Sequence, residues 1–214
     1  MHEVNSSTAE AARWAKAERR ARGIADHGLG KALTRYFTLY FPAILLVLMA
    51  GGAVASSLIF GLAWNDPTSF QLGFLLAGIG TLILGLVYNA YRIRPAAEVG
   101  TLSVLMALES DEQKKVRRQI LRKILPETTQ LAVSRAAAVQ LRKSLATSLM
   151  ILPMLLFCVT SNLFAVSGGL WWLVASAIPF SLIAAVQVIR EFRSAGQFLR
   201  ETEDGPALKT DDHQ

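Results

Sequence analysis

The chain has 214 residues, 52% of them hydrophobic, and its 22 Lys and Arg against 16 Asp and Glu give a formal net charge of +6. The hydrophobic residues are concentrated in three blocks without any charge, at 36–65, 67–91 and 144–189. This pattern disfavours a soluble helical bundle, whose helices need long polar faces, and the single cysteine, Cys158, excludes an internal disulfide.

Residues 1–35 form a basic N-terminal tail. Ser7 and Glu10 have the spacing of a capping box and predict a helix that runs through Arg22 and stops at Gly23. Two interpretations of this helix remain open. It is either a solvated helix that only directs membrane insertion, or a helix that lies on anionic lipid with Trp14 inserted.

The uncharged blocks predict four transmembrane helices. Because a bilayer-spanning helix needs about 20 mainly apolar residues, the first two blocks hold one span each, at roughly 38–63 and 70–91. The third block is long enough for two spans, at roughly 145–166 and 170–189, on either side of the turn Ser167-Gly168-Gly169.

The positive charge predicts the orientation of these spans. Seven Lys and Arg lie in the N-terminal tail, eleven in 92–143 and four in the C-terminal tail, 190–214, whereas the two short connections have none. Lys and Arg near span ends favour the cytoplasmic side. We therefore predict an all-α integral membrane four-helix bundle of two transmembrane hairpins, 36–91 and 144–189. A cytoplasmic helical hairpin lies between spans 2 and 3, and both termini are cytoplasmic at the inner or plasma membrane.

The aromatic residues predict the same orientation, because Trp and Tyr prefer the membrane interface. The predicted outer ends of the spans carry Trp64, Trp171 and Trp172. The predicted inner ends carry Tyr36, Tyr40, Tyr88 and Tyr91. We interpret all seven as interfacial anchors.

The segment 92–143 contains a basic amphipathic helix. Ser110 and Gln113 have the spacing of a second capping box, and the helix is predicted to run from there to Pro126. Val116, Ile120 and Ile124 recur every four residues and form an apolar stripe. Most of the remaining surface is basic and is our candidate lipid- or partner-binding site: Lys114, Lys115, Arg117, Arg118, Arg122 and Lys123.

Basic amphipathic helices lie on membranes or dock in the apolar grooves of partner proteins. Alternatively, the apolar stripe packs on the next predicted helix, 128–143. Both interpretations stay open, because one cytoplasmic hairpin could do both. Nucleic acid is not an expected partner, because no aromatic side chain interleaves the basic run.

Small residues at four-residue spacing predict close helix packing inside the bundle. Such residues let the backbones of two transmembrane helices approach one another. In span 2 they are Gly73, Ala77, Thr81, Gly85 and Asn89, and in span 4 they are Ala177, Ser181 and Ala185. The packing partner is either another span of the same chain or a second copy, so that we expect a homo-oligomer or a membrane-protein partner.

No span contains Asp, Glu, Lys, Arg or His, the residue types that mark proton relays, ion sites and metal ligands inside membranes. There is no HExxH motif and no Gly-rich phosphate loop. We therefore expect no catalytic residue, no metal and no cofactor, and we predict that the protein is not an enzyme.

The sequence thus predicts a small multi-pass membrane protein that acts as an interaction or accessory subunit through helix packing and its basic cytoplasmic helix. The alternative is an oligomeric pore or permease component. Pro153 and Pro179 interrupt spans 3 and 4, and kinked helices with polar residues recur in transporters. The last residues, which are acidic, are expected to be disordered.

Overall fold

A computed structural model of the chain describes residues 2–61, 66–100, 102–125, 130–165 and 171–203. Nearly all of the described chain is helical, apart from one antiparallel pair of two-residue strands. The chain divides into two compact units. We call Gly30–Pro95 with Leu145–Ile189 the apolar unit, and Met1–Leu29 with Ala96–Ser144 and Arg190–Gln214 the charged unit.

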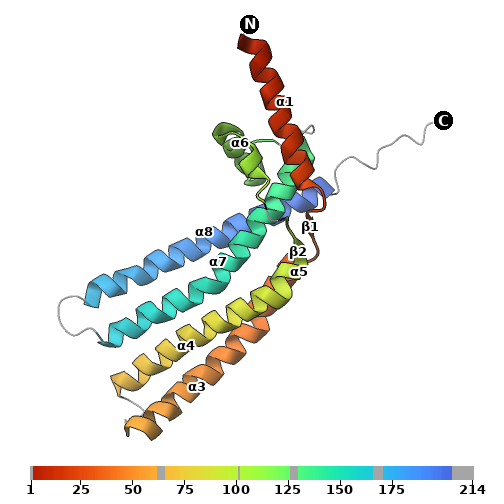
Figure 1. Cartoon of the computed structure of the whole chain (residues 1–214). Coiled ribbons are helices and arrows are strands. Elements are labelled where there is room, and N and C mark those ends of the chain that lie inside the picture. The colour runs from red at the N-terminus through yellow and green to blue at the C-terminus, as the bar shows by residue number, and fades with distance from the viewer. Residues whose placement is uncertain (1, 62–65, 101, 126–129, 166–170, 204–214) are drawn as a thin grey trace. The chain divides into compact units, whose positions relative to one another are not determined.

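The first half of the apolar unit is a helical hairpin (Figure 1). Its first arm consists of α2 (Leu29–Arg35), a π-helical turn η1 (Tyr36–Tyr40) and α3 (Phe41–Phe60). Its second arm consists of α4 (Pro67–Tyr88), a second π-helical turn η2 (Asn89–Ile93) and the short α5 (Arg94–Ala96). Gly61 ends α3 in the left-handed conformation, with φ of 64°, which glycine adopts without a steric cost.

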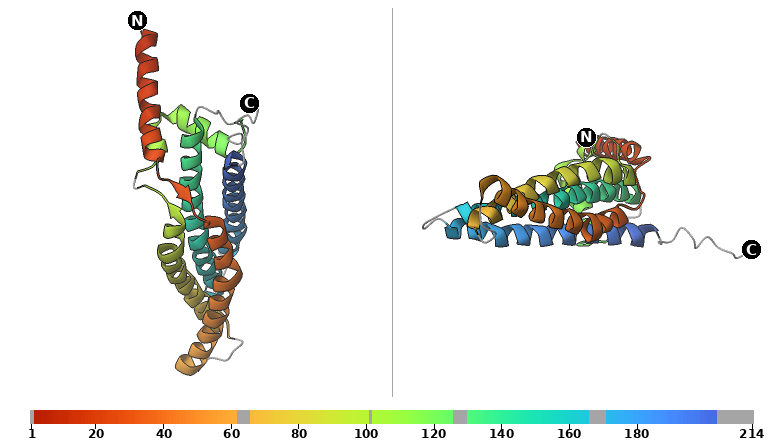
Figure 2. Two further views of the ribbon diagram at one scale, coloured as in Figure 1. Left: turned by 90° about the vertical axis from the view of Figure 1, so that its right-hand side faces the viewer. Right: turned by 90° about the horizontal axis from the view of Figure 1, so that it is seen from below.

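The second half of the apolar unit comes from two longer helices, α7 (Leu131–Ala165) and α8 (Trp171–Glu203), each of which contributes residues to both units. Within the apolar unit they lie side by side in the views of Figures 1 and 2. Pro153 and Pro179 lie inside these helices and end neither of them. The continuity of α7 agrees with the absence of a helix breaker before Pro153. The predicted turn 167–169 lies outside the described residues.

Glycines set the closest contacts of the apolar unit. Where α3 crosses α4, a Cβ on Gly52 would lie 2.8 Å from the Cα of Gly73, so the two backbones touch. Gly85 lies on the same face of α4 and makes a close contact with α7, because a Cβ on Gly85 would lie 3.1 Å from the carbonyl oxygen of Met150. Ser161 of α7 donates a hydrogen bond of 3.0 Å to the carbonyl of Gln71. These contacts pack α3, α4 and α7 into a bundle.

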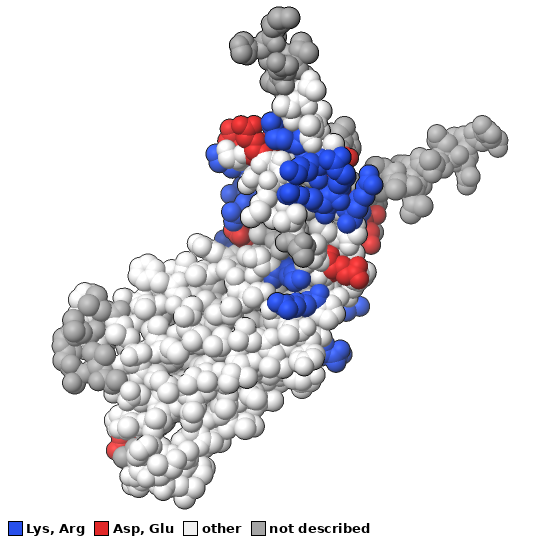
Figure 3. All heavy atoms as spheres, viewed as in Figure 1, with Lys and Arg blue, Asp and Glu red and all other residues white. Residues whose placement is uncertain are grey.

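Among the described residues, four helices are long and apolar enough to cross a membrane: Leu29–Phe60, Pro67–Ala96, Leu131–Phe164 and Val174–Glu203. Their outward faces carry large apolar side chains, among them Leu46, Ile83 and Phe180. On the face drawn in Figure 3, most of the surface of the apolar unit shows no Lys, Arg, Asp or Glu.

The charged unit begins with α1 (His2–Ala21), which is followed by β1 (Ala25–Asp26). β1 pairs antiparallel with β2 (Ala97–Glu98), with Ala25 opposite Glu98. A 3₁₀ turn, η3 (Leu105–Ala107), packs against α1 and leads to α6 (Ser110–Ile120). The buried residues of this unit include Val104, Val116 and Ile120, and a run on α7 from Ala136 to Val139.

Several local predictions are wrong. α1 already begins at His2, so Ser7 lies inside the helix and does not cap it. The N-cap of α6 is Glu109 rather than Ser110, because the Glu112 carboxylate accepts the Glu109 N–H at 2.7 Å. α6 also ends at Ile120, well before Pro126, which lies outside the described residues.

The prediction that four tyrosines are interfacial anchors is also wrong for two of them, because these two are core residues. Tyr36 is completely buried and Tyr88 nearly so, whereas Tyr40 and Tyr91 are exposed. Trp171 and Trp172 are exposed, and their role as anchors stays a prediction, whereas Trp64 lies outside the described residues.

Candidate functional site

The predicted small-residue face of α4 lies in the interior of the apolar unit. Four of its members are buried, namely Gly73, Ala77, Thr81 and Gly85. Asn89 is half-buried, and its side-chain oxygen lies 3.5 Å from the Thr147 hydroxyl of α7. This face of α4 therefore packs against other helices of the same chain. Ala177, Ser181 and Ala185 of α8 are half-buried along one side of their helix, and packing between copies stays a prediction for them.

The basic face of α6 is partly occupied by acids of the same chain. Arg117 pairs with Glu191 of α8 at 3.5 Å, and Arg122 pairs with Glu201 of α8 at 3.1 Å. Lys114 pairs with Asp111 at 3.0 Å on α6 itself. The other three predicted cations are exposed: Lys115, Arg118 and Lys123.

The apolar stripe of α6 is also occupied. Val116 and Ile120 are completely buried, and between them the buried Gln119 accepts a hydrogen bond of 3.0 Å from Ser134 of α7. Ile124, the third predicted member, lies beyond the helix and is exposed. α6 therefore packs its stripe on α7, which is one of the two interpretations of the sequence, and it has no free apolar face to insert into lipid while it stays folded this way.

Arg122 holds a strained backbone conformation at the end of α6. Its φ is 60°, in the left-handed region that non-glycine residues seldom adopt. The Lys123 N–H donates to the Arg118 carbonyl at 2.8 Å, which is the hydrogen bond of a Schellman-type helix end. In this conformation the Arg122 side chain donates to Gln197 at 3.1 Å and pairs with Glu201 on α8. The ion pair and hydrogen bond offset the backbone strain.

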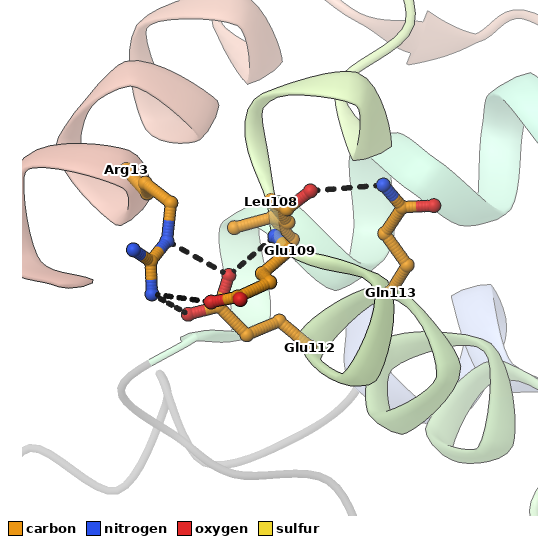
Figure 4. Close-up of polar contacts among 5 residues, drawn as sticks. All are labelled: Arg13, Leu108, Glu109, Glu112 and Gln113. Atoms are coloured by element: carbon orange, nitrogen blue, oxygen red, sulfur yellow. Dashed lines mark hydrogen bonds and ion pairs between the residues drawn. The ribbon is translucent and has the colours of Figure 1, made fainter.

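A second polar cluster joins α1 to the start of α6 (Figure 4). The Arg13 guanidinium donates to both carboxylate oxygens of Glu112, at 3.3 and 3.2 Å, and lies 3.1 Å from Glu109. Burial raises the pKa of Glu112, but hydrogen bonds from Arg13 and from the Glu109 N–H lower it by more, so the pKa lies below its usual value. Trp14 and Ala17 of the same helix are turned inward, and Ala17 is completely buried. Trp14 is thus not on a free face for insertion into lipid.

Acidification is expected to release α1 from this cluster. A carboxylate with a depressed folded-state pKa stabilises the fold above its unfolded pKa, about 4.3 for Glu, and the stabilisation is lost as the pH falls through the folded value. With Trp64, Trp171 and Trp172 replaced by Phe, the emission of Trp14 should shift to the red between about pH 5 and about pH 3. Glu112→Gln should show the shifted emission already at neutral pH. Trp14 emission that is unchanged across this pH range would contradict the role of the Glu112 carboxylate in holding α1.

A buried ion pair connects three elements of the charged unit. The carboxylate of Asp26, the last residue of β1, pairs with Arg142 of α7, and both side chains are mostly buried. Its other oxygen accepts the N–H groups of Gly28 and Leu29 at 3.0 and 2.8 Å, so Asp26 caps the start of α2. On α8, the Phe192 ring lies 4.7 Å from the Arg142 guanidinium carbon, and Gly196 leaves room for the guanidinium group. Sequence analysis missed this site, because the partners lie far apart in the chain.

The apolar unit has its own cationic site, which we call the hairpin base and define as residues 31–40 and 88–94. Its core is aromatic: the Tyr88 ring lies 5.1 Å from that of Tyr36 and 5.3 Å from that of Tyr40. The Tyr88 hydroxyl donates to the Ala32 carbonyl at 2.9 Å and so ties the end of α4 to α2. The surface of the hairpin base carries four exposed cations: Lys31, Arg35, Arg92 and Arg94.

Comparisons with models of known protein families, with curated proteins and with solved structures give no match. Among the described residues, no group of three or more His, Cys, Asp and Glu side chains is placed to hold a metal ion. The case for function therefore rests on the charged and apolar surfaces described above.

Proposed function

We propose that the chain is a multi-pass membrane protein of the inner or plasma membrane, with both termini cytoplasmic, that acts as an interaction or accessory subunit. The observation that carries this proposal is the separation of charge between the two units. The apolar unit contains four cations, all of them in the hairpin base, and a single acid, Asp66. Cations at one end of an otherwise uncharged bundle favour the cytoplasmic side for that end.

The charged unit supports a role in binding rather than in transport or catalysis. Its helices are fixed to each other by ion pairs and by a small core, and exposed cations such as Arg118 and Lys123 remain on its surface. Such a surface suits an acidic partner or anionic headgroups. The expected partners are membrane lipid together with a membrane protein or a second copy of the chain.

The pore alternative has less support from the spans. Five of their described polar side chains donate to a carbonyl of their own helix: Ser56 to Ala53, Thr81 to Gly78, Thr160 to Leu156, Asn162 to Cys158 and Ser181 to Ala177. Side chains satisfied in this way do not need a polar path. We keep the pore as the second candidate.

Cysteine labelling in intact cells tests the orientation. In a Cys158→Ala background, a membrane-impermeant maleimide should label Thr68→Cys, in the first turn of α4, without permeabilisation. Lys123→Cys, beyond α6, should react only after the cells are permeabilised. The reverse pattern would contradict cytoplasmic termini, and labelling of both sites only after permeabilisation would contradict membrane insertion.

The same protein, purified in mild detergent, tests the role. We expect light scattering to show a homo-oligomer or a stoichiometric complex with another membrane protein. A monomer without a partner would contradict the interaction role. Solute flux or single-channel conductance after reconstitution into liposomes would favour the pore instead.

A further inference from the structure

The hairpin base differs from the basic helix α6 in that its described cations form no ion pair with an acid of the described chain. The sequence places only one acidic residue, Asp66, in the apolar unit, and this residue caps the far end of α4. The 22 residues of α4, a helix about 33 Å long, separate that end from η2 and Arg92. In the described part of the chain, none of the four cations of the hairpin base forms an ion pair. Lys114 and Arg117 of α6, and Arg122 just after it, are in contrast paired with acids.

Two of these cations lie on the two arms of the hairpin where the arms are in contact. Arg35 ends α2, directly before Tyr36, and Arg92 lies in η2, one turn after Tyr88, and the rings of these two tyrosines lie 5.1 Å apart. Two guanidinium groups that approach one point repel each other unless an anion lies between them. The planar fork of arginine suits phosphate oxygens in particular, because it donates two parallel hydrogen bonds.

The backbone beside these arginines contains two π-helical turns. The Phe41 N–H bonds to the Tyr36 carbonyl, and the Arg94 N–H bonds to the Asn89 carbonyl, so that each arm contains one π-helical turn. π-helical turns are rare and occur often at functional sites. Here both occur next to the Tyr36–Tyr88 contact, which is buried and holds the two turns together.

The hairpin base also has an apolar margin. Tyr91 is 77% exposed and Leu39 is 59% exposed, and each lies in one of the two π-helical turns. Tyr side chains with an exposed ring and hydroxyl are favoured at the level of lipid headgroups. An anion that contacts this margin as well as the arginines needs an apolar part, as a phospholipid has and free phosphate does not.

We propose that the hairpin base binds the headgroup of an anionic phospholipid, with Arg35 and Arg92 as its phosphate ligands. The proposal rests on the membrane insertion proposed above. It moves the main lipid contact of the protein from α6, where the sequence suggests it, to the first hairpin. Tyr91 and Leu39 would lie against the glycerol and acyl region of the same lipid.

Native mass spectrometry of the full chain in mild detergent tests the proposal. Given equal amounts of phosphatidylglycerol and phosphatidylcholine, the wild-type protein should retain phosphatidylglycerol preferentially. Arg35→Gln/Arg92→Gln should reduce this retention at least about tenfold. The matched control, Arg19→Gln/Arg22→Gln, removes the same charge from the exposed side of α1 and should retain the lipid as the wild type does.

Equal loss in the control would overturn the site, because retention would then follow net charge alone. Displacement of the lipid by an equal concentration of inorganic phosphate would also overturn it, in favour of a free-anion site. If the glutamine variant does not fold, Arg35→Lys/Arg92→Lys replaces it, and retention equal to that of the wild type would exclude paired guanidinium ligands. If the protein inserts with the expected labelling pattern but shows no preference for phosphatidylglycerol, only the lipid site is contradicted. If the protein does not insert, the proposed function is contradicted as well.

Discussion

Gly52→Ala is expected to force α3 and α4 apart and to lower the free energy of unfolding by about 1–3 kcal/mol, the usual cost of overpacking. The added methyl group would lie 2.8 Å from the Cα of Gly73 and 3.4 Å from its nitrogen. Both are backbone atoms of a helix and cannot rotate away as a side-chain methyl can. The contact can be relieved only by moving one helix against the other, which also disturbs the neighbouring contacts of α4 with α7.

Gly51→Ala is a closely matched control, since the residue is adjacent on the same helix and a Cβ there meets nothing within 4 Å. Alanine at this position should be neutral or stabilise α3 by up to about 1 kcal/mol, because it favours helix more than glycine does. Thermal unfolding of both variants in detergent, followed by circular dichroism, measures the difference. If Gly51→Ala and Gly52→Ala unfold at the same temperature, the close crossing of α3 and α4 is wrong.

Arg142→Met is expected to destabilise the charged unit by about 3–5 kcal/mol, the range observed when one partner of a buried ion pair is removed. The substitution keeps most of the side-chain length but leaves the Asp26 carboxylate mostly buried without its cation. Asp26 also caps α2, and Arg142 also lies against Phe192 of α8, so the change affects the contacts of three elements. Increased hydrogen exchange in β1, β2 and the end of α8 should accompany the lower unfolding temperature.

Arg118→Met is the control for this prediction, because Arg118 is exposed, and surface substitutions usually change stability by less than about 0.5 kcal/mol. The double variant Asp26→Asn/Arg142→Met removes both charges and should recover part of the loss, since no charge then stays buried without a partner. If the double variant is as unstable as the sum of the two single variants, the two residues do not act as a pair.

The helical class and the four membrane-type helices could be predicted from the sequence, because long uncharged blocks leave few other possibilities. The continuity of α7 was predictable for the same reason, as nothing before Pro153 breaks a helix. Helix starts were less predictable: two Ser-x-x-Glu/Gln patterns indicated capping boxes, yet Ser7 is inside α1, and Glu109 replaces Ser110 as the cap of α6. Short polar patterns of this kind recur by chance, and tertiary contacts such as Arg13 with Glu112 decide between them.

The candidate sites could be predicted only in part, because their partners are distant in the chain. The amphipathic pattern of α6 was visible, but the acids that neutralise Arg117 and Arg122 lie more than 70 residues away on α8. Tyr36 and Tyr88 matched an interfacial belt by position, and only the structure shows that their rings contact each other in the core. The π-helical turns had no sequence signal, since their residues resemble those of the α-helices beside them.

Because of the two π-helical turns, the number of residues in each arm of the hairpin determines which side chains share one side of it. Each residue of an α-helix turns the chain by about 100°, so a segment with one more or one fewer residue points everything beyond it in a new direction. A relative that lacked a single residue in 36–40 would keep Lys31 and Arg35 in its sequence, yet would present them on another side of the hairpin from Arg92. When distant relatives of this protein are aligned, a one-residue gap at either turn will therefore matter more than most substitutions within it.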